Sequence, residues 1–282
     1  MRIRRESPLR ELANRPGSLN QLKRLGDAIR DDNAQAYRGV HYDDVFSWYN
    51  DLVVAVIEDI DGASLKSLLA DPDSLTITGR AKTRNTVREK LRRRHADKLP
   101  SIQDLAGVRI EADMTLSEQD AVAKTLCDWF GQGADAVHDL RDGEHAGYRA
   151  VHVWVRLDQP KGAWFEIQVR TLLQSEWANY FEALADYLGR DLRYGFIPVR
   201  EDLAEQVRAT QEVSRDMITK FEQLRDQTQN LRLDEGRGRT DHPIVSADTL
   251  DPLRAAMRGV TDQLRSMIQE GGPQNVELRR DL

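Results

Sequence analysis

The chain has 282 residues, of which 40% are hydrophobic and 31% charged, and its formal net charge at pH 7 is −6. This composition predicts a globular protein of one or two domains, and the net negative charge disfavours bulk electrostatic binding to nucleic acid. The single cysteine, the absence of a ~20-residue apolar run and the charged N-terminus predict a cytoplasmic protein without a disulfide, a membrane span or a signal peptide.

Hydrophobic periodicity predicts helices and one strand in the first third of the chain. Apolar residues recur every three or four positions in residues 18–31 and 42–60, as they do on one face of a helix. A short helix is expected near residues 63–69. Residues 75–80 alternate as a strand does, and the arginine-rich segment 85–95 reads as a basic helix.

The rest of the chain predicts three more strands and then only helices. Ser117 and Gly131 are the expected N-cap and stop of a helix between two strands. The final dozen residues are expected to be loose. The predicted elements are strand 108–112, helix 117–130, strands 151–157 and 163–170, and helices 172–187, 203–231 and 250–268.

The order of these elements predicts an α+β fold. Strands and helices mix without strict βαβ alternation, so we expect a small mixed β-sheet flanked by helices, with helical N- and C-terminal extensions. The expected parts are a polar N-terminal extension (1–40), a central domain (41–200) and a helical C-terminal extension (201–282) with a linker near 234–243.

The two adjacent strands around Pro160 predict a hairpin with one polar face. Facing residues should have numbers that sum to about 320, which places Trp154 opposite Glu166 and His152 opposite Gln168. Two tryptophans and a histidine favour a ligand-binding face over an inert solvated one. The polar face would consist of His152, Trp154, Arg156, Trp164, Glu166, Gln168 and Arg170.

Charged residues upstream of the hairpin have the chemistry of a phosphate and metal site. Arg80 and Lys82 lead into the basic helix, and guanidinium groups grip phosphate oxygens well, although a solvated basic helix explains this cluster equally simply. Asp104 precedes a strand and, if it is not a cap, could join Glu166 in holding Mg²⁺ through two carboxylates. Tyr148 follows a glycine at a strand entrance, where its ring either stacks on a base or joins the core.

Taken together, these segments resemble the synthetase domain of the RelA/SpoT family, the (p)ppGpp or alarmone synthetases. The resemblance covers roughly residues 45–190 and implies a nucleotidyltransferase-like synthetase fold. It also implies transfer of the β,γ-diphosphate of ATP to the ribose 3′-hydroxyl of GDP or GTP. The matching segments are Gly79–Lys82, Lys90, Asp104–Arg109, Gly147–His152 and Glu166–Thr171.

The resemblance also implies roles for individual residues. Asp104 and Glu166 would hold Mg²⁺ as the catalytic pair, and Glu166 would help to deprotonate the attacking hydroxyl. ATP would be bound by Arg80, Lys82, Lys90 and Arg109, and the acceptor by Tyr148, His152 and Gln168.

Two departures from the family pattern leave the acceptor open. Residues 142–146 are acidic where the family usually has a lysine, and Phe181–Ala183 replaces a Glu-His pair. The first hypothesis is a guanosine alarmone synthetase. The alternatives are a toxin enzyme that modifies the 3′ end of tRNA or makes adenosine alarmones, with an antitoxin partner, and an inactive nucleotide-binding regulator. Homo-oligomerisation is open, and His138-Asp139, the sole His-Asp pair, is interpreted as chance.

Overall fold

The structure is a computed structural model that describes residues 7–12, 14–32, 36–94, 97–158, 162–234, 251–274 and 276–281. The centre of the predicted turn at Pro160 and nearly all of the predicted linker lie outside these ranges. The chain forms two compact units built from discontinuous segments. Unit 1 comprises residues 1–110, 121–138 and 152–169, and unit 2 comprises residues 111–120, 139–151 and 170–282. The linear division expected from the sequence stays a prediction.

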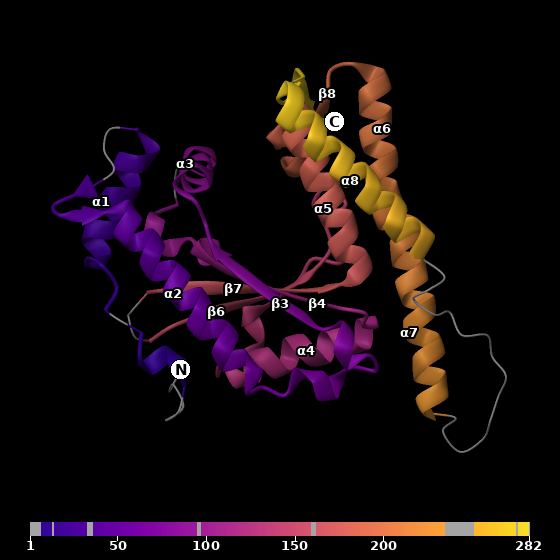
Figure 1. The fold of residues 1–282 in the computed structure, drawn as a ribbon, viewed down its shortest axis with the longest axis horizontal. Coiled ribbons are helices and arrows are strands. Elements are labelled where there is room, and N and C mark those ends of the chain that lie inside the picture. Colours follow the sequence, from indigo (N-terminus) through magenta and orange to yellow (C-terminus); the bar gives the residue numbers. More distant parts are fainter. Residues whose placement is uncertain are drawn as a thin grey trace. The chain divides into compact units, whose positions relative to one another are not determined.

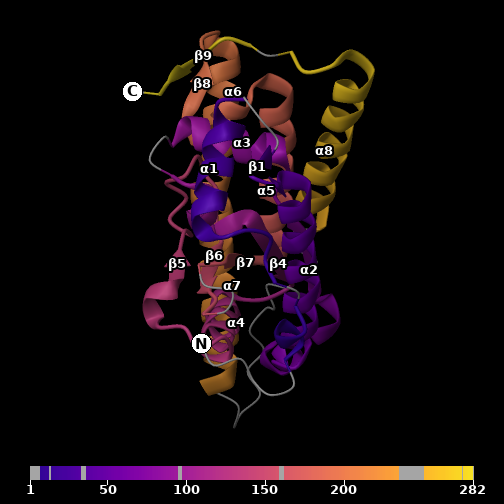
Figure 2. The same ribbon diagram turned by 90° about the vertical axis from the view of Figure 1, so that its left-hand side faces the viewer.

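The elements confirm an α+β fold with a mixed five-stranded sheet in the order β3-β4-β7-β6-β5. Figure 2 shows β5 at the edge of this sheet, next to β6. The helices are α1 (Leu19–Arg30), α2 (Tyr42–Asp61), α3 (Arg84–Arg93), α4 (Leu116–Trp129), α5 (Leu172–Leu188), α6 (Glu201–Glu212), α7 (Thr219–Asp234) and α8 (Asp251–Gly271). The strands are β1 (Ala36–Tyr37), β2 (Val40–His41), β3 (Thr76–Ala81), β4 (Ala106–Ala112), β5 (Val137–Asp139), β6 (Val151–Arg156), β7 (Trp164–Thr171), β8 (Phe196–Pro198) and β9 (Leu278–Arg280).

The hairpin of β6 and β7 has the predicted register and the predicted apolar face. The Leu157 amide donates to the Ala163 carbonyl at 2.9 Å, and these two numbers add to the expected sum. On the apolar face Phe165 is fully buried and meets Phe130 of the chain after α4 edge-on, with ring centroids 5.1 Å apart. Strict alternation along both strands therefore separates the core from the polar face.

Close packing in unit 1 fixes the strand that begins the candidate site. Helix α2 lies over β3 (Figure 1), and a Cβ added at Gly79 would lie 2.6 Å from Val53 of α2 and 3.0 Å from the Gly107 carbonyl. A larger residue at position 79 would push α2 or β4 away. Glycine is required here because there is no space for a side chain, and not because of its backbone dihedral angles.

The expected N-cap of α4 is wrong. Ser117 is not the N-cap of α4: Thr115 and Glu118 form reciprocal side-chain-to-backbone bonds at the helix start, while Ser117 lies inside the helix and binds Asp226. The predicted helix 203–231 is confirmed as one continuous helical run, in which a π-helical segment, Val213–Ile218, separates α6 from α7.

In unit 2, the chain end is ordered into a strand instead of being loose. Strand β9 pairs antiparallel with β8, with Phe196 opposite Arg280. Helix α8 packs along α5 (Figure 1) over a core in which Trp177 stacks on Phe181 at 4.8 Å. Among the described residues, none of the helices has both the length and the apolar character to cross a membrane.

Candidate active site

A cluster of opposite charges in unit 1 brings together three of the predicted donor and metal residues. Asp104 accepts from Lys82 at 2.7 Å through one oxygen and from Lys90 at 2.9 Å through the other. These side chains are 21–23% exposed, so the cluster is shielded but still open to a ligand. It holds two positive charges around one carboxylate, an arrangement that can exchange the carboxylate for phosphate oxygens.

Backbone pairing explains why these three residues meet. The Lys82 amide donates to the Leu105 carbonyl at 2.8 Å, which joins the end of β3 to the start of β4. Asp104 lies in the 3₁₀ turn Gln103–Leu105, directly before β4. The hydroxyl of Tyr42 donates to the Lys82 carbonyl at 2.7 Å and fixes the backbone where α3 begins. Helix α3 then carries Lys90 back to the same carboxylate.

Glu166 lies on the polar face of the hairpin, where the residue is 7% exposed. Its Oε2 accepts from Trp154 Nε1 at 2.9 Å and lies 3.5 Å from His152 Nδ1, and its Oε1 accepts from Gln168 Nε2 at 2.7 Å. The predicted cross-strand pairing of Trp154 and Glu166 is therefore present as a direct hydrogen bond. The face is a built and largely buried polar site and not a solvated one.

Both carboxylates are held in their ionised form. Burial opposes ionisation of Asp104, but the charges of Lys82 and Lys90 outweigh it and hold the pKa of this carboxyl below its usual value. Burial likewise opposes ionisation of Glu166, but the His152 charge and the hydrogen bonds from His152 and Gln168 lower the pKa of that carboxyl to about 2. Glu166 and Asp104 also interact electrostatically, since the Glu166 charge raises the pKa of Asp104.

The donor set of this site fits a hard divalent cation. Mg²⁺ takes oxygen ligands and commonly binds one or two protein carboxylates, with water and substrate phosphates completing its shell. Asp104 and Glu166 supply two ionised carboxylates, and a carboxylate oxygen that accepts one hydrogen bond keeps a second lone pair. No group of three or more His, Cys, Asp or Glu that could hold a metal occurs in the part of the chain that the structure describes. Two carboxylates are the number of protein ligands that Mg²⁺ commonly takes when it is shared with a phosphate.

The two predicted adenine-flanking arginines lie on neighbouring strands. Arg80 is exposed on β3, and Arg109 is half-buried on β4. The Arg80 carbonyl lies 3.8 Å from the Cβ position of Gly107, two residues before Arg109. Both arginines thus belong to unit 1, with the lysines and the carboxylates.

Tyr148, the predicted acceptor-stacking residue, belongs to unit 2, whereas His152 and Gln168 belong to unit 1. In unit 2 the Tyr148 hydroxyl accepts from Arg170 Nη2 at 2.8 Å, and the Arg170 guanidinium lies 5.0 Å from the tyrosine ring centroid. Arg170 is itself buried. The guanidinium thus holds the ring by a hydrogen bond and a cation–π contact.

His138 belongs to the site but was not predicted. Its imidazole contacts the Trp154 ring at an interplanar angle of 39°, with ring centroids 3.7 Å apart. Burial together with the nearby His152 lowers the pKa of His138. Its Nε2 is buried and accepts no hydrogen bond within the described residues. Strand β5 has only three residues, and a segment this short shows no hydrophobic periodicity from which a strand could be predicted. This strand brings His138 beside the hairpin.

Comparisons with known proteins identify the family of the chain. The region found in RelA / SpoT proteins matches residues 79–190, which contain each of the predicted site residues. The uncharacterized protein Rv1366 of Mycobacterium tuberculosis is 44% identical over 211 residues, covering 72% of this chain and 74% of that protein. The uncharacterized protein Mb1401 of Mycobacterium bovis matches equally. The chain therefore belongs to the RelA/SpoT family, whose members are nucleotide-binding transferases.

Solved structures with a similar arrangement include small bacterial enzymes. The small alarmone synthetase 1 from Bacillus subtilis, bound to its product pppGpp, is 22% identical with a TM-score of 0.47, covering 64% of this chain and 94% of that one. A GTP pyrophosphokinase family protein from Streptococcus pneumoniae is 20% identical with a TM-score of 0.48, covering 68% of this chain and 96% of that one.

Proposed function

We propose that this protein is an ATP-dependent pyrophosphokinase that transfers the β,γ-diphosphate of ATP to the ribose 3′-hydroxyl of GDP or GTP. The observation that carries the proposal is the meeting of Lys82, Lys90 and Asp104 in unit 1, together with the ionised Glu166. Family membership supports the same reaction class.

In the proposed reaction the 3′-oxygen of the acceptor attacks the β-phosphorus of ATP. The bond between the β-phosphorus and the bridging oxygen to the α-phosphorus breaks, and AMP leaves with that oxygen. The products are AMP and an acceptor that carries a 3′-diphosphate. Phosphoryl transfers of this kind depend mainly on alignment and on neutralisation of phosphate charge.

The donor residues divide this work. Lys82 and Lys90 exchange Asp104 for the β- and γ-phosphate oxygens, and Arg80 and Arg109 flank the adenine. Asp104 and Glu166 would hold Mg²⁺, which when bound supplies positive charge to the phosphate oxygens. All six of these residues lie within unit 1.

Glu166 is also the proposed acceptor of the hydroxyl proton. Its pKa of about 2 makes it a weak base in the free protein. A loose phosphoryl-transfer transition state demands little of its base because the hydroxyl proton leaves late. His152 and Gln168 hold the carboxylate in place by their contacts to its two oxygens. For the acceptor, the proposed role of Tyr148 is to stack on the base, and the proposed role of His152 and Gln168 is to bind the nucleotide.

The test incubates the purified protein with Mg²⁺, ATP labelled at the γ-phosphate, and GDP, GTP, ATP or tRNA in turn. The expected result is label on the guanosine nucleotide with an equal yield of AMP. Label found only on tRNA, or only on an adenosine nucleotide, overturns the guanosine acceptor and favours the toxin-type enzyme. ATP binding without AMP release for every acceptor overturns the enzyme itself and leaves a nucleotide-binding regulator.

A further inference from the structure

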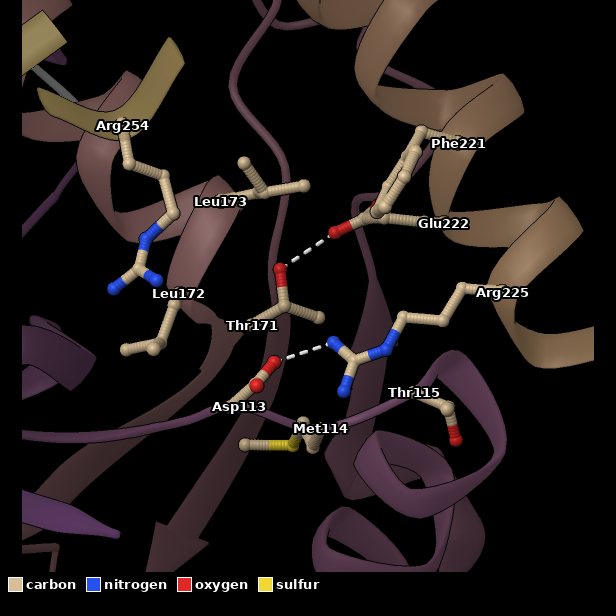
Figure 3. A pocket seen from close by; sticks show the side chains of 10 residues that line it. All are labelled: Asp113, Met114, Thr115, Thr171, Leu172, Leu173, Phe221, Glu222, Arg225 and Arg254. Carbon is tan, nitrogen blue, oxygen red and sulfur yellow. Dashed lines mark hydrogen bonds and ion pairs between the residues drawn. The ribbon is translucent and has the colours of Figure 1, made fainter. Parts of the chain in front are cut away.

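The helices that follow the matched family region contribute a buried carboxylate to unit 2. Glu222 of α7 is 4% exposed. Its Oε1 accepts from the Thr171 hydroxyl at 2.5 Å, and its Oε2 accepts from Arg149 Nη2 at 2.9 Å and from Gln174 Nε2 at 3.2 Å. Figure 3 shows Glu222 directed from α7 toward Thr171. One residue of the C-terminal extension thus binds the end of β7, the start of α5 and the residue after Tyr148.

The π-helical segment Val213–Ile218 holds the residue before Tyr148. The Ser214 hydroxyl donates to the Gly147 carbonyl at 2.5 Å, and both groups are buried. One turn later, Thr219 accepts from the guanidinium of Arg149. π-Helical turns inside longer helices are uncommon and often occur at functional sites. Here the π-helical segment faces the loop that carries Tyr148.

The backbone of this loop has little freedom to move. Gly147 has a φ of +84°, and a Cβ at this position would lie 2.8 Å from the indole of Trp177. That indole donates to the Thr210 carbonyl of α6 at 3.1 Å. The loop is therefore confined between α5 and the C-terminal helices, and glycine is the residue that tolerates both the dihedral angle and the contact.

Burial of this network indicates a positioning role. The Arg149 and Glu222 side chains are 3% and 5% exposed, and a buried ion pair adds little net stability because its desolvation offsets its attraction. What such a pair does provide is one defined geometry, since any displacement leaves a buried charge without its partner. Both oxygens of Glu222 accept from protein donors, Thr171 on Oε1 and Arg149 and Gln174 on Oε2, so this carboxylate links three segments of unit 2.

We infer that the helical run α6–α7 is the positioning element of the acceptor tyrosine, with Ser214 and Glu222 as its positioning residues. Ser214 holds the backbone carbonyl before Tyr148, and Glu222 holds the side chain of the residue after it. Together they set the affinity for the acceptor nucleotide. The ATP side, built within unit 1 from other contacts, does not depend on them. This inference rests on the proposed function, in which Tyr148 stacks on the acceptor base.

Two variants and a matched control test it in the full-length protein. Glu222→Gln keeps the side-chain shape but replaces one acceptor oxygen by a donor, and Ser214→Ala removes the single bond to Gly147. Glu205→Gln, at an exposed position of α6, is the control. We expect KM for the acceptor to rise about tenfold in Glu222→Gln and severalfold in Ser214→Ala, with KM for ATP within about twofold. Glu205→Gln should match the wild type.

Amide hydrogen exchange gives a second readout that needs no activity. In both variants the amides of residues 143–150 should exchange about tenfold faster than in the wild type, while those of α1 stay unchanged. If the wild type transfers no diphosphate, the proposed function fails but this exchange result still decides the positioning role.

Three outcomes overturn the inference. One is an unchanged acceptor KM together with unchanged exchange in both variants. Another is an equal rise in KM for ATP and acceptor, which would show a general structural role. The third is a wild-type acceptor KM in Ser214→Ala when circular dichroism shows that Glu222→Gln does not fold. In that case Ser214→Ala alone decides the positioning role.

Discussion

The donor site in unit 1 and the Tyr148 loop in unit 2 are built by contacts of very different sequence separation. Lys82 and Lys90 reach Asp104 across 22 and 14 positions. In unit 2, Arg149 reaches Glu222 across 73 positions and Gly147 is held by Ser214 across 67. The donor contacts lie inside the matched family region 79–190, whereas the supports of the loop lie beyond it. The contacts among the proposed donor residues thus lie within the family segment, whereas the loop of Tyr148 receives contacts from the C-terminal extension.

The two regions also differ in how their charges are solvated. Lys82, Lys90 and Asp104 keep about a fifth of their side-chain surface in contact with solvent, so the lysines can change partners at modest cost. Arg149 and Glu222 are almost completely buried, and separating them would leave uncompensated charges. The first cluster is suited to exchanging ligands, and the second is suited to holding a shape.

The largest effect is expected from Glu166→Gln. The amide cannot bind a hard cation as a carboxylate does and cannot accept the hydroxyl proton, so transfer should fall by about 10³-fold or more. The fold should persist because the side chain lies on the polar face and not in the apolar core. Initial-rate assays with labelled ATP measure the loss, and circular dichroism measures the fold.

The matched control for this change is Glu58→Gln, at an exposed position on α2. It should leave the rate within about twofold of the wild type, as surface substitutions away from a site usually do. Transfer by Glu166→Gln at close to the wild-type rate would remove Glu166 from the catalytic centre.

Replacing one lysine of the donor cluster should have the next largest effect. Lys90→Met keeps the length of the side chain but removes its charge, so ATP loses one phosphate contact and Asp104 loses one of its two partners. We expect kcat/KM to fall about 100-fold, mostly through KM for ATP. A rise in the acceptor KM with no change for ATP would contradict the assignment of Lys90 to the donor side.

The low pKa of Glu166 predicts a pH dependence of stability. Its pKa of about 2 in the folded protein is below the ordinary value of 4.5, so its ionised form stabilises the fold. This contribution is complete above about pH 4.5 and is lost as the pH falls toward 2. Between pH 6 and pH 3, the wild type should therefore lose about 2 kcal/mol more of its unfolding free energy than Glu166→Gln does.

Urea unfolding of both proteins at pH 6, 4.5 and 3 measures this difference, and the other carboxyl groups cancel between them. Parallel losses in the two proteins would show that the Glu166 carboxylate is not specially stabilised in the folded state.

The structural features that were predicted correctly from the sequence depend on contacts between residues close together in the chain. Alternation along β6 and β7 was enough to place Trp154 opposite Glu166, because strand period and turn position determine the register of a hairpin. The family resemblance supplied Asp104 and the two lysines, which the structure joins directly. The roles that this resemblance assigns to them stay predictions.

The features that were not predicted from the sequence depend on partners far away along the chain. Ser117 looked like an N-cap, but Asp226 of α7 binds it and Thr115 caps the helix instead. Strand β9 exists because β8 pairs with it, and a three-residue segment has no periodicity to reveal that. The link between Glu222 and Arg149 was invisible for the same reason, since nothing in a local pattern identifies a partner 73 residues away.

A smaller kinetic effect than at Glu166 or Lys90, and the most discriminating one, is expected at Tyr148. Tyr148→Ala removes the ring proposed to stack on the acceptor base, so the acceptor KM should rise about tenfold, since base stacking is worth about 1–3 kcal/mol, while KM for ATP changes little. Tyr148→Phe keeps the ring and removes only the hydroxyl that Arg170 binds, so it should stay within about threefold of the wild type. If both variants lose acceptor affinity equally, the hydroxyl bond to Arg170 and not the ring would be the important contact. If Tyr148→Ala weakens ATP and acceptor alike, the separation between a donor site in unit 1 and an acceptor residue in unit 2 would no longer hold.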